Sequence, residues 1–230
     1  MNRQGVPRLI MFDLDGTLAD TAFQLGIAVN AALRDLGKKE ISMDALRSYI
    51  GNGASMLLAR GLAGRRDISL TDVDDKELSR ARSVFNDTYL SCCDCSSKIY
   101  PGVVDTLSEL KNLGIRLAVV TNKPHRFIEP VLEPSGLLDY FDFWLGSEVI
   151  PEKKPDKAPL LYTASRLGIS IDDSWMVGDS VNDILAAVNA GIPGIALTFG
   201  YNQGVDFQKL GAFRIIDDFR EILAIIKDPD

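Results

Sequence analysis

Residues 9–18 read Leu-Ile-Met-Phe-Asp-Leu-Asp-Gly-Thr-Leu, and this decapeptide decides the fold. Its first four residues are apolar, which is typical of a buried strand in a parallel sheet. Asp13 and Asp15 follow at once, and side chains at i and i+2 of an extended chain point to the same side. A strand followed by an ordinary Asx turn accounts for Asp15 and Gly16 but not for Asp13. We therefore expect the two carboxylates to converge on one small ligand or ion.

The composition is that of an ordinary globular protein. The chain has 230 residues, of which 46% are hydrophobic and 25% charged, enough for one sizeable core and a second small one. The net charge of −7 argues against general binding of nucleic acids or anionic membranes. No apolar stretch has the length of a membrane span, and residues 1–8 lack the hydrophobic region of a secretory signal. These features predict a cytoplasmic protein.

Cysteine and histidine give no sign of a zinc site. The three cysteines, Cys92, Cys93 and Cys95, lie in one cluster, and His125 is the only histidine. Four soft ligands are therefore not available together. Three closely spaced thiols also fit a reducing compartment better than a disulfide framework. We interpret the cysteines as loop or helix-end residues and His125 as a residue at the start of a helix.

The apolar pattern divides the chain into a helical part and an alternating part. Residues 20–97 show helical spacing, with helices expected at 23–36, 43–50, 53–61 and 72–91. From Pro101-Gly102 onward, expected helices at 103–113, 126–132, 158–167, 183–190 and 219–226 alternate with expected strands at 116–120, 141–145, 174–177, 194–197 and 214–216. This alternation predicts an α/β fold with a parallel sheet. The predicted domains are 1–19 with 98–230, and a helical module, 20–97, inserted between them.

Polar residues follow several of the predicted strands. In open parallel sheets a ligand lies at the carboxyl ends of the strands. Those ends carry Asp13 and Asp15, then Thr121-Asn122-Lys123, then Asp179 and Asp183, while Lys154 lies between them in the chain. Four carboxylates at one point would repel one another unless a hard divalent cation lay among them. Oxygen ligands without histidine or cysteine favour Mg²⁺.

This set of residues suits phosphoryl transfer. A cation, the Lys154 ammonium group and the Thr121 hydroxyl can surround a dianionic phosphoryl group and neutralise its charge. Asp13 is then the predicted nucleophile, which forms an aspartyl-phosphate. Asp15, on the same side, can protonate the leaving oxygen and later activate water. The catalytic residues predicted in this way are Asp13, Asp15, Thr121 and Lys154.

The order of these motifs resembles that of the haloacid dehalogenase-like hydrolase superfamily. The similarity covers the whole chain and rests on Asp13-x-Asp15-Gly16-Thr17, Thr121, Lys154-Pro155 and Gly178-Asp179-x-x-x-Asp183. It implies a Rossmann-like core with an inserted helical cap, a Mg²⁺ requirement and the catalytic roles given above. It also implies that the metal is held by Asp13, the main-chain carbonyl of Asp15 and Asp179, with support from Asp183.

Further residues are similar to one branch of that superfamily, the bacterial phosphoglycolate phosphatases. They are Ile50-Gly51-Asn52-Gly53-Ala54, Thr121-Asn122-Lys123-Pro124, Lys154-Pro155-x-x-Ala158-Pro159-Leu160-Leu161 and Thr198-Phe199-Gly200-Tyr201-Asn202. Lys157 departs from the pattern, since that branch commonly has proline there. The resemblance implies hydrolysis of 2-phosphoglycolate to glycolate and phosphate. It adds to the expected substrate contacts, which are Thr121, Lys154, Asn122, Lys123, Gly51, Asn52 and Gly53.

Other functions fit parts of the same pattern. The same mechanism could serve another small phosphate, such as a sugar phosphate or pyrophosphate. A mutase would need further acid/base groups in the cap, and a dehalogenase would leave Asp15 and the second acidic pair without a role. A signalling receiver would carry its reactive aspartate after the third strand, and a silent binding protein would show no turnover. The expected partner is a small phosphorylated metabolite, and the expected state is a monomer or homodimer.

Overall fold

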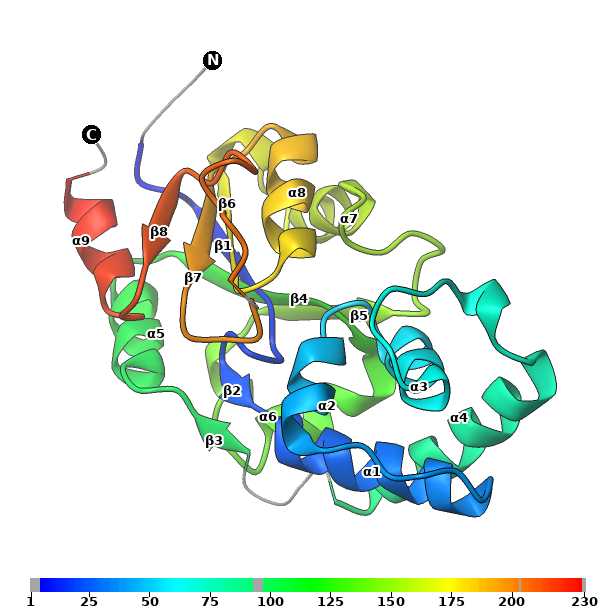
Figure 1. Cartoon of the computed structure of the whole chain (residues 1–230). Helices are drawn as coiled ribbons and strands as arrows, with labels where there is room; N and C mark the ends of the chain where they lie inside the picture. The colour runs from blue at the N-terminus through cyan, green and yellow to red at the C-terminus, as the bar shows by residue number, and fades with distance from the viewer. Residues whose placement is uncertain (1–4, 93–96, 203, 229–230) are drawn as a thin grey trace.

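The candidate site lies at the strand ends of one parallel sheet. The computed structural model describes residues 5–92, 97–202 and 204–228, and within them six strands lie in the order β5-β4-β1-β6-β7-β8 (Figure 1). The central strand β1 (Leu9–Phe12) pairs in parallel with β4 (Arg116–Pro124) and with β6 (Ser174–Gly178). The outer strands are β5 (Phe143–Ser147), β7 (Gly194–Leu197) and β8 (Arg214–Ile216). The three central strands therefore end at one edge, where a ligand can meet residues from all of them.

Helices cover both faces of this sheet. They are α5 (Val103–Asn112) and α9 (Glu221–Lys227) on one face, and α7 (Ala158–Arg166) and α8 (Val181–Ala190) on the other (Figure 1). Because side chains alternate along a strand, Ile10 and Phe12 pack on the first face, and Leu9 and Met11 pack on the second. All four side chains are fully buried. This explains why β1 is a continuous apolar run, and it confirms the predicted α/β fold.

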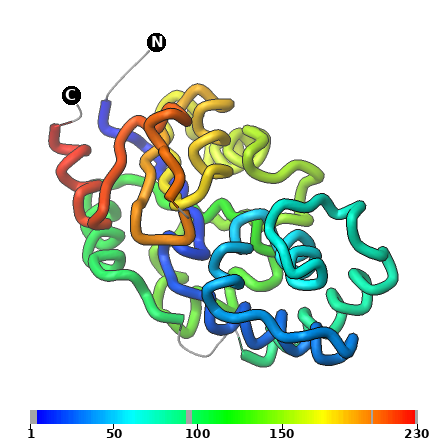
Figure 2. Tube along the Cα trace, viewed as in Figure 1, coloured from blue at the N-terminus to red at the C-terminus, as the bar shows by residue number. Residues whose placement is uncertain are grey.

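The helical insertion, here called the cap, enters and leaves through two paired linkers. Its helices are α1 (Ala22–Asp35), α2 (Met43–Tyr49), α3 (Ala54–Ala63) and α4 (Asp75–Leu90). The linkers β2 (Ala19–Asp20) and β3 (Lys98–Ile99) lie antiparallel to each other. Figure 2 shows the chain leaving the sheet after β1, passing through the cap and returning to α5. The division into domains at residues 19 and 98 stays a prediction.

Element ends follow local capping chemistry. The expected helix at 72–91 begins only at Asp75, because the Asp74 side chain accepts hydrogen bonds from Lys76 N and Glu77 N, and residues Leu70–Asp72 form a separate 3₁₀ turn. The expected helix at 126–132 is divided into the 3₁₀ helix His125–Phe127 and α6 (Glu129–Leu132). His125 thus begins a helix, as expected. Cys92 lies in the turn after α4, whereas Cys93 and Cys95 fall outside the described residues.

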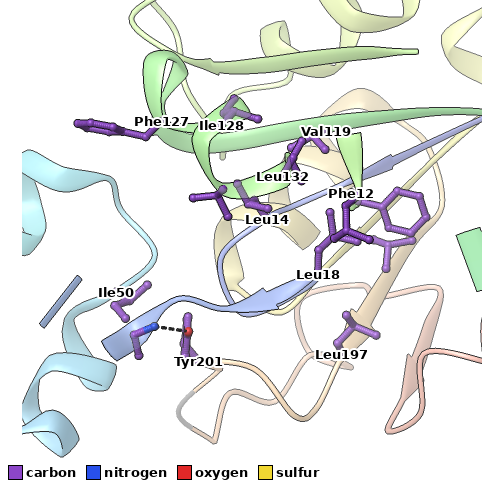
Figure 3. Close-up of a cluster of buried hydrophobic side chains, with 14 of the residues drawn as sticks. Phe12, Leu14, Leu18, Ile50, Val119, Phe127, Ile128, Leu132, Leu197 and Tyr201 are labelled. Carbon is purple, nitrogen blue, oxygen red and sulfur yellow. Dashed lines mark hydrogen bonds between the residues drawn. The ribbon is translucent and has the colours of Figure 1, made fainter. Parts of the chain in front are cut away.

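One apolar core extends from the sheet into the cap. Phe12 of β1 and Phe127 belong to the same buried cluster as Ile50, which follows α2 (Figure 3). Phe85 and Tyr89 of α4 stack with ring centroids 5.5 Å apart, and Phe127 lies edge-on to both. The cap is therefore closed onto the strand ends. None of the helices in the described residues is long and apolar enough to cross a membrane.

Candidate active site

Asp13 and Lys154 form the centre of the site. Asp13 directly follows β1, where its N–H donates to Val177 O at 3.0 Å. The Lys154 ammonium group donates to Asp13 Oδ1 at 2.9 Å, to Asp183 Oδ1 at 2.6 Å and to the carbonyl of Val120. Its side chain is 2% exposed. Burial alone would lower the pKa of Lys154, but the two carboxylates outweigh it, so the pKa is raised and the ammonium group is charged.

The second acidic pair is held by its own network. Asp183 lies in the first turn of α8, and its Oδ2 accepts hydrogen bonds from Ser180 N at 2.9 Å and Ser180 Oγ at 2.7 Å. The contact from Ser180 N belongs to a capping box, in which the Ser180 side chain in turn accepts from the Asp183 N–H. Asp179 Oδ1 accepts from Thr17 Oγ1 at 2.8 Å, and its Oδ2 accepts from Tyr201 N at 2.6 Å. Each carboxylate is thus oriented by donors that leave part of it available to a ligand.

The acidic residues fit a hard divalent cation. One oxygen each from Asp13, Asp179 and Asp183 lies within 4.8 Å of the others. Burial, opposed by Lys154, raises the pKa of Asp13 to about 6. Burial and the charges of Asp13 and Asp183 raise the pKa of Asp179 well above its ordinary value. Negative charge is therefore in excess here, and a cation bound by oxygen would remove that excess.

Asp15 is paired with Lys123, which the sequence did not predict. The Lys123 ammonium group lies 2.8 Å from Asp15 Oδ1 and 3.0 Å from Oδ2, and the side chain is 2% exposed. It also lies 4.6 Å from the centre of the Tyr89 ring on α4, a cation–π contact with the cap. The Thr21 hydroxyl donates to Asp15 Oδ1 at 2.7 Å. Asp15 is therefore held beside Asp13 by groups from the core and from the cap linker.

A loop of the cap closes over the strand ends. Gly51 O accepts hydrogen bonds from Asn182 Nδ2 at 3.0 Å and Asn122 Nδ2 at 3.4 Å. The Asn122 side chain also donates to Lys154 O at 2.9 Å. A Cβ at Gly53 would lie 3.0 Å from Asn122 O, so a larger residue there would press the cap loop away from β4. Asn122 thus joins the cap loop to the loop that carries Lys154.

The cap and the strand ends enclose a cavity of about 40 Å³. Its polar lining comes from Asp13, Asp15, Thr121 and Lys123, and its cap side includes Gly51 and Gly53. The rest of the wall is largely apolar and is formed by Leu25, Ile50, Ala54, Leu57, Phe85, Tyr89, Pro124 and Phe127. Asn52 instead lines an outer depression with Arg82, Glu148 and Asn122. The structure therefore brings Gly51, Gly53 and Lys123 to the cavity but places Asn52 outside it.

Comparison with known proteins agrees with this geometry. The model of the haloacid dehalogenase-like hydrolase family matches residues 10–197. The chain belongs to that family. The phosphoglycolate phosphatase of Pseudomonas putida is 40% identical over 97% of this chain and 81% of its own length. That of Psychrobacter arcticus is 40% identical over 94% of both chains. The crystal structure of a predicted phosphoglycolate phosphatase from Haemophilus somnus superposes with a TM-score of 0.85 and 36% identity, covering 97% of this chain and 98% of that one.

In this member of the haloacid dehalogenase-like hydrolase family, several supporting residues escaped the sequence analysis. The Tyr201 contact joins residues from different elements, and Thr21 lies six residues after Asp15, at a spacing that no local pattern indicates. Ser180 instead fits a local pattern, since a serine three residues before an acidic residue at a helix start is typical of a capping box. The residues that meet at the strand ends were thus easier to predict than those that orient them.

Proposed function

We propose that this protein is a Mg²⁺-dependent phosphatase that hydrolyses 2-phosphoglycolate to glycolate and phosphate. The observation that carries the proposal is that Asp13 lines a small cavity together with Lys123. Asp13 also contacts Lys154 and belongs to the acidic group with Asp179 and Asp183. Relatives about 40% identical over nearly the whole chain are named phosphoglycolate phosphatases, which supports the same activity here.

Asp13 is the nucleophile in this proposal. One carboxylate oxygen attacks phosphorus, the bond between phosphorus and the glycolate oxygen breaks, and an aspartyl-phosphate forms. Lys154 contacts the same carboxylate at 2.9 Å and keeps it oriented, and its positive charge favours the phosphoryl oxygens. Thr121 lines the cavity beside Asp13 and offers its hydroxyl to the same oxygens. Bound Mg²⁺, held by Asp13, Asp179, Asp183 and the Asp15 carbonyl, would supply further positive charge.

Asp15 moves the protons. In the first step its protonated form gives a proton to the glycolate oxygen as that group leaves. In the second step the resulting carboxylate takes a proton from water, which attacks the aspartyl-phosphate and releases phosphate from Asp13. The hydrogen bonds from Thr21 and Lys123 hold the Asp15 side chain beside the nucleophile. The closed cap excludes bulk water from both steps.

The cavity favours a small anionic substrate. The cavity is small, with a volume of about 40 Å³. The apolar wall offers no partners for several sugar hydroxyls, and each hydroxyl buried without a hydrogen bond costs about 1–3 kcal/mol. Lys123 is the one cation among the described residues that line the cavity. It is suited to bind the carboxylate of 2-phosphoglycolate.

Phosphate release from a panel of compounds tests the proposal. The panel contains 2-phosphoglycolate, ethyl phosphate, several sugar phosphates and pyrophosphate, each assayed with Mg²⁺ and with a chelator. We expect Mg²⁺-dependent release with the highest kcat/KM for 2-phosphoglycolate. A higher value for a sugar phosphate or for pyrophosphate would overturn the substrate assignment. Equal activity with the chelator would overturn the metal dependence.

A further inference from the structure

The loop of residues 198–202, which follows β7, touches both the acidic site and a linker of the cap. The N–H of Tyr201 donates to Asp179 Oδ2 at 2.6 Å. At Gly200 a Cβ would overlap the Asp179 carboxylate, so the backbone approaches Asp179 as closely as glycine allows. The ring of Phe199 lies 4.7 Å from that of Tyr100, which directly follows the linker β3. This loop therefore contacts a proposed metal ligand and the return path of the cap.

The Tyr201 side chain reaches the other linker. Its hydroxyl accepts hydrogen bonds from Thr21 N at 2.9 Å and Ala22 N at 3.0 Å, where α1 begins, and donates to Asp20 Oδ1 at 2.7 Å. Figure 3 shows Tyr201 with a hydrogen bond to this hydroxyl. Tyr201 is 6% exposed, and burial raises the pKa of its hydroxyl, which keeps the proton that it donates to Asp20. One buried hydroxyl thus serves three groups at the first linker.

The cap adds a further contact to this cluster. Arg47 of α2 forms an ion pair with Asp20 Oδ2 at 2.8 Å, and its guanidinium group lies 5.6 Å from the centre of the Tyr201 ring. Opening the cap by rotation about its linkers would disturb these contacts and those of the Tyr201 hydroxyl together. The backbone of the same residue orients Asp179, so a shift of Tyr201 would also move a carboxylate of the acidic site.

We propose that Tyr201 is a positioning residue that couples closure of the cap to cation binding. Its hydroxyl holds the first linker in the closed position, and its main-chain N–H holds Asp179 in the orientation that the cation needs. Such coupling is reciprocal: if closure strengthens cation binding, then the cation must strengthen closure by the same factor. The inference rests on the proposed function, because it takes Mg²⁺ as the cation bound at the acidic site.

Amide hydrogen exchange and Mg²⁺ titration of the free protein test this coupling. In the wild type, saturating Mg²⁺ is expected to slow exchange at the Thr21 and Ala22 amides by about 5-fold or more, a typical coupling factor. In Tyr201→Phe the hydroxyl is lost while the N–H to Asp179 remains. That variant is expected to bind Mg²⁺ about 5-fold more weakly, with no effect of Mg²⁺ on the two amides.

Tyr162→Phe is the matched control. Tyr162 lies on α7 with its ring 6.3 Å from that of Phe143, on the opposite side of the sheet from α5, and it is expected to leave Mg²⁺ affinity at the wild-type value. A merely structural role for Tyr201 would speed exchange in Tyr201→Phe without changing Mg²⁺ affinity, and that result would overturn the inference. If Tyr201→Phe does not fold, wild-type exchange decides alone, and amides that Mg²⁺ leaves unchanged contradict the coupling. A wild type that binds no Mg²⁺ would instead overturn the proposed function.

Discussion

Two buried lysines contact different carboxylates of the candidate site. Lys154 contacts Asp13 and Asp183, whereas Lys123 contacts both oxygens of Asp15. Each ammonium group neutralises charge that would otherwise be costly to bury. The two lysines differ in what lies beside them, because Lys123 lines the cavity and also contacts the cap. They are therefore expected to have different roles, Lys154 at the phosphoryl group and Lys123 at the rest of the substrate.

Lys123→Met is expected to remove substrate selectivity. The variant keeps most of the side-chain volume but loses the charge, so kcat/KM for 2-phosphoglycolate should fall by about 100-fold or more, in the range for a truncated buried charge pair. For ethyl phosphate, which lacks the carboxylate, the fall should be about 10-fold, because only the charged hydrogen bond that holds Asp15 is lost. Steady-state kinetics of both substrates measure this difference.

The control for that variant is Lys39→Met, at an exposed lysine between α1 and α2. It is expected to behave as the wild type with both substrates. An equal loss of activity for both substrates in Lys123→Met would mean that Lys123 only orients Asp15. In that case the carboxylate of the substrate would have to be bound elsewhere.

In helix α8, one carboxylate contributes both to the stability of the helix and to the acidic site. Its capping box uses Asp183, the same residue that contacts Lys154 at 2.6 Å. The start of α8 is therefore stabilised by a carboxylate that also belongs to the acidic cluster. Loss of the helix cap at Ser180 should loosen the first turn of α8 and the site together, whereas loss of a helix cap elsewhere should affect stability alone.

Ser180→Ala and Asp74→Ala form a matched pair that tests this point. Each removes a helix cap and is expected to lower the free energy of unfolding by about 1 kcal/mol. Only Ser180→Ala should also lower kcat/KM, because Asp74 caps α4 away from the strand ends. Urea denaturation and phosphatase assays provide the two measurements. Normal activity in Ser180→Ala would show that Lys154 and the main-chain N–H of residue 180 keep Asp183 in place without the hydroxyl.

The element pattern and the site were predictable to different extents. Parallel strands end at one edge, so the residues at the carboxyl ends of β1, β4 and β6 had to meet. The structure places Asp13 beside Asp179 and Asp183, and it places Thr121 at the same cavity as Asp13. The pairing of Lys123 with Asp15 depends on side-chain paths that no spacing indicates. The position of Asn52 outside the cavity depends on how the cap loop lies against β4.

At the scale of the whole molecule, closure of the cap depends on polar contacts as well as on the shared core. Arg82 of α4 forms an ion pair at 2.6 Å with Glu148, which follows β5 and has a φ of 80°. A non-glycine residue in this left-handed region is strained, and the contact with the cap helps to keep it there. Asp20 and Arg47 form a second ion pair near the linkers. A cytoplasmic location and a monomeric or dimeric state stay predictions.

Acid is expected to weaken the Asp20 contacts. Burial would raise the pKa of Asp20, but hydrogen bonds from Arg47 and Tyr201 outweigh it, so the pKa is lowered. A carboxylate with a lowered folded-state pKa adds stability above its unfolded pKa, about 3.9, and this stability is lost as pH falls through the folded value. Asp20→Asn should therefore lose less stability than the wild type between about pH 5 and about pH 3. Urea denaturation at several pH values measures this, and parallel pH profiles would contradict the assignment.

Mg²⁺ is expected to stabilise the whole fold. A ligand that binds only the folded state at 100 times its Kd adds about 2.7 kcal/mol to the free energy of unfolding. Thermal denaturation should therefore show a higher Tm with Mg²⁺ than with a chelator. Asp44→Asn, at an exposed residue of α2, serves as a control and should keep this shift. An unchanged wild-type Tm at saturating Mg²⁺ would argue against a cation at the acidic residues.

In the proposed reaction Asp13 carries the phosphoryl group. This can be measured by mass spectrometry of peptides from enzyme that is acid-quenched during turnover of 2-phosphoglycolate. We predict a phosphoryl group on the peptide that contains Asp13, and its absence in Asp13→Asn, together with a loss of kcat of about 10⁴-fold or more, as for other nucleophile deletions. Normal turnover by Asp13→Asn, or phosphorylation of a different residue, would exclude Asp13 as the nucleophile.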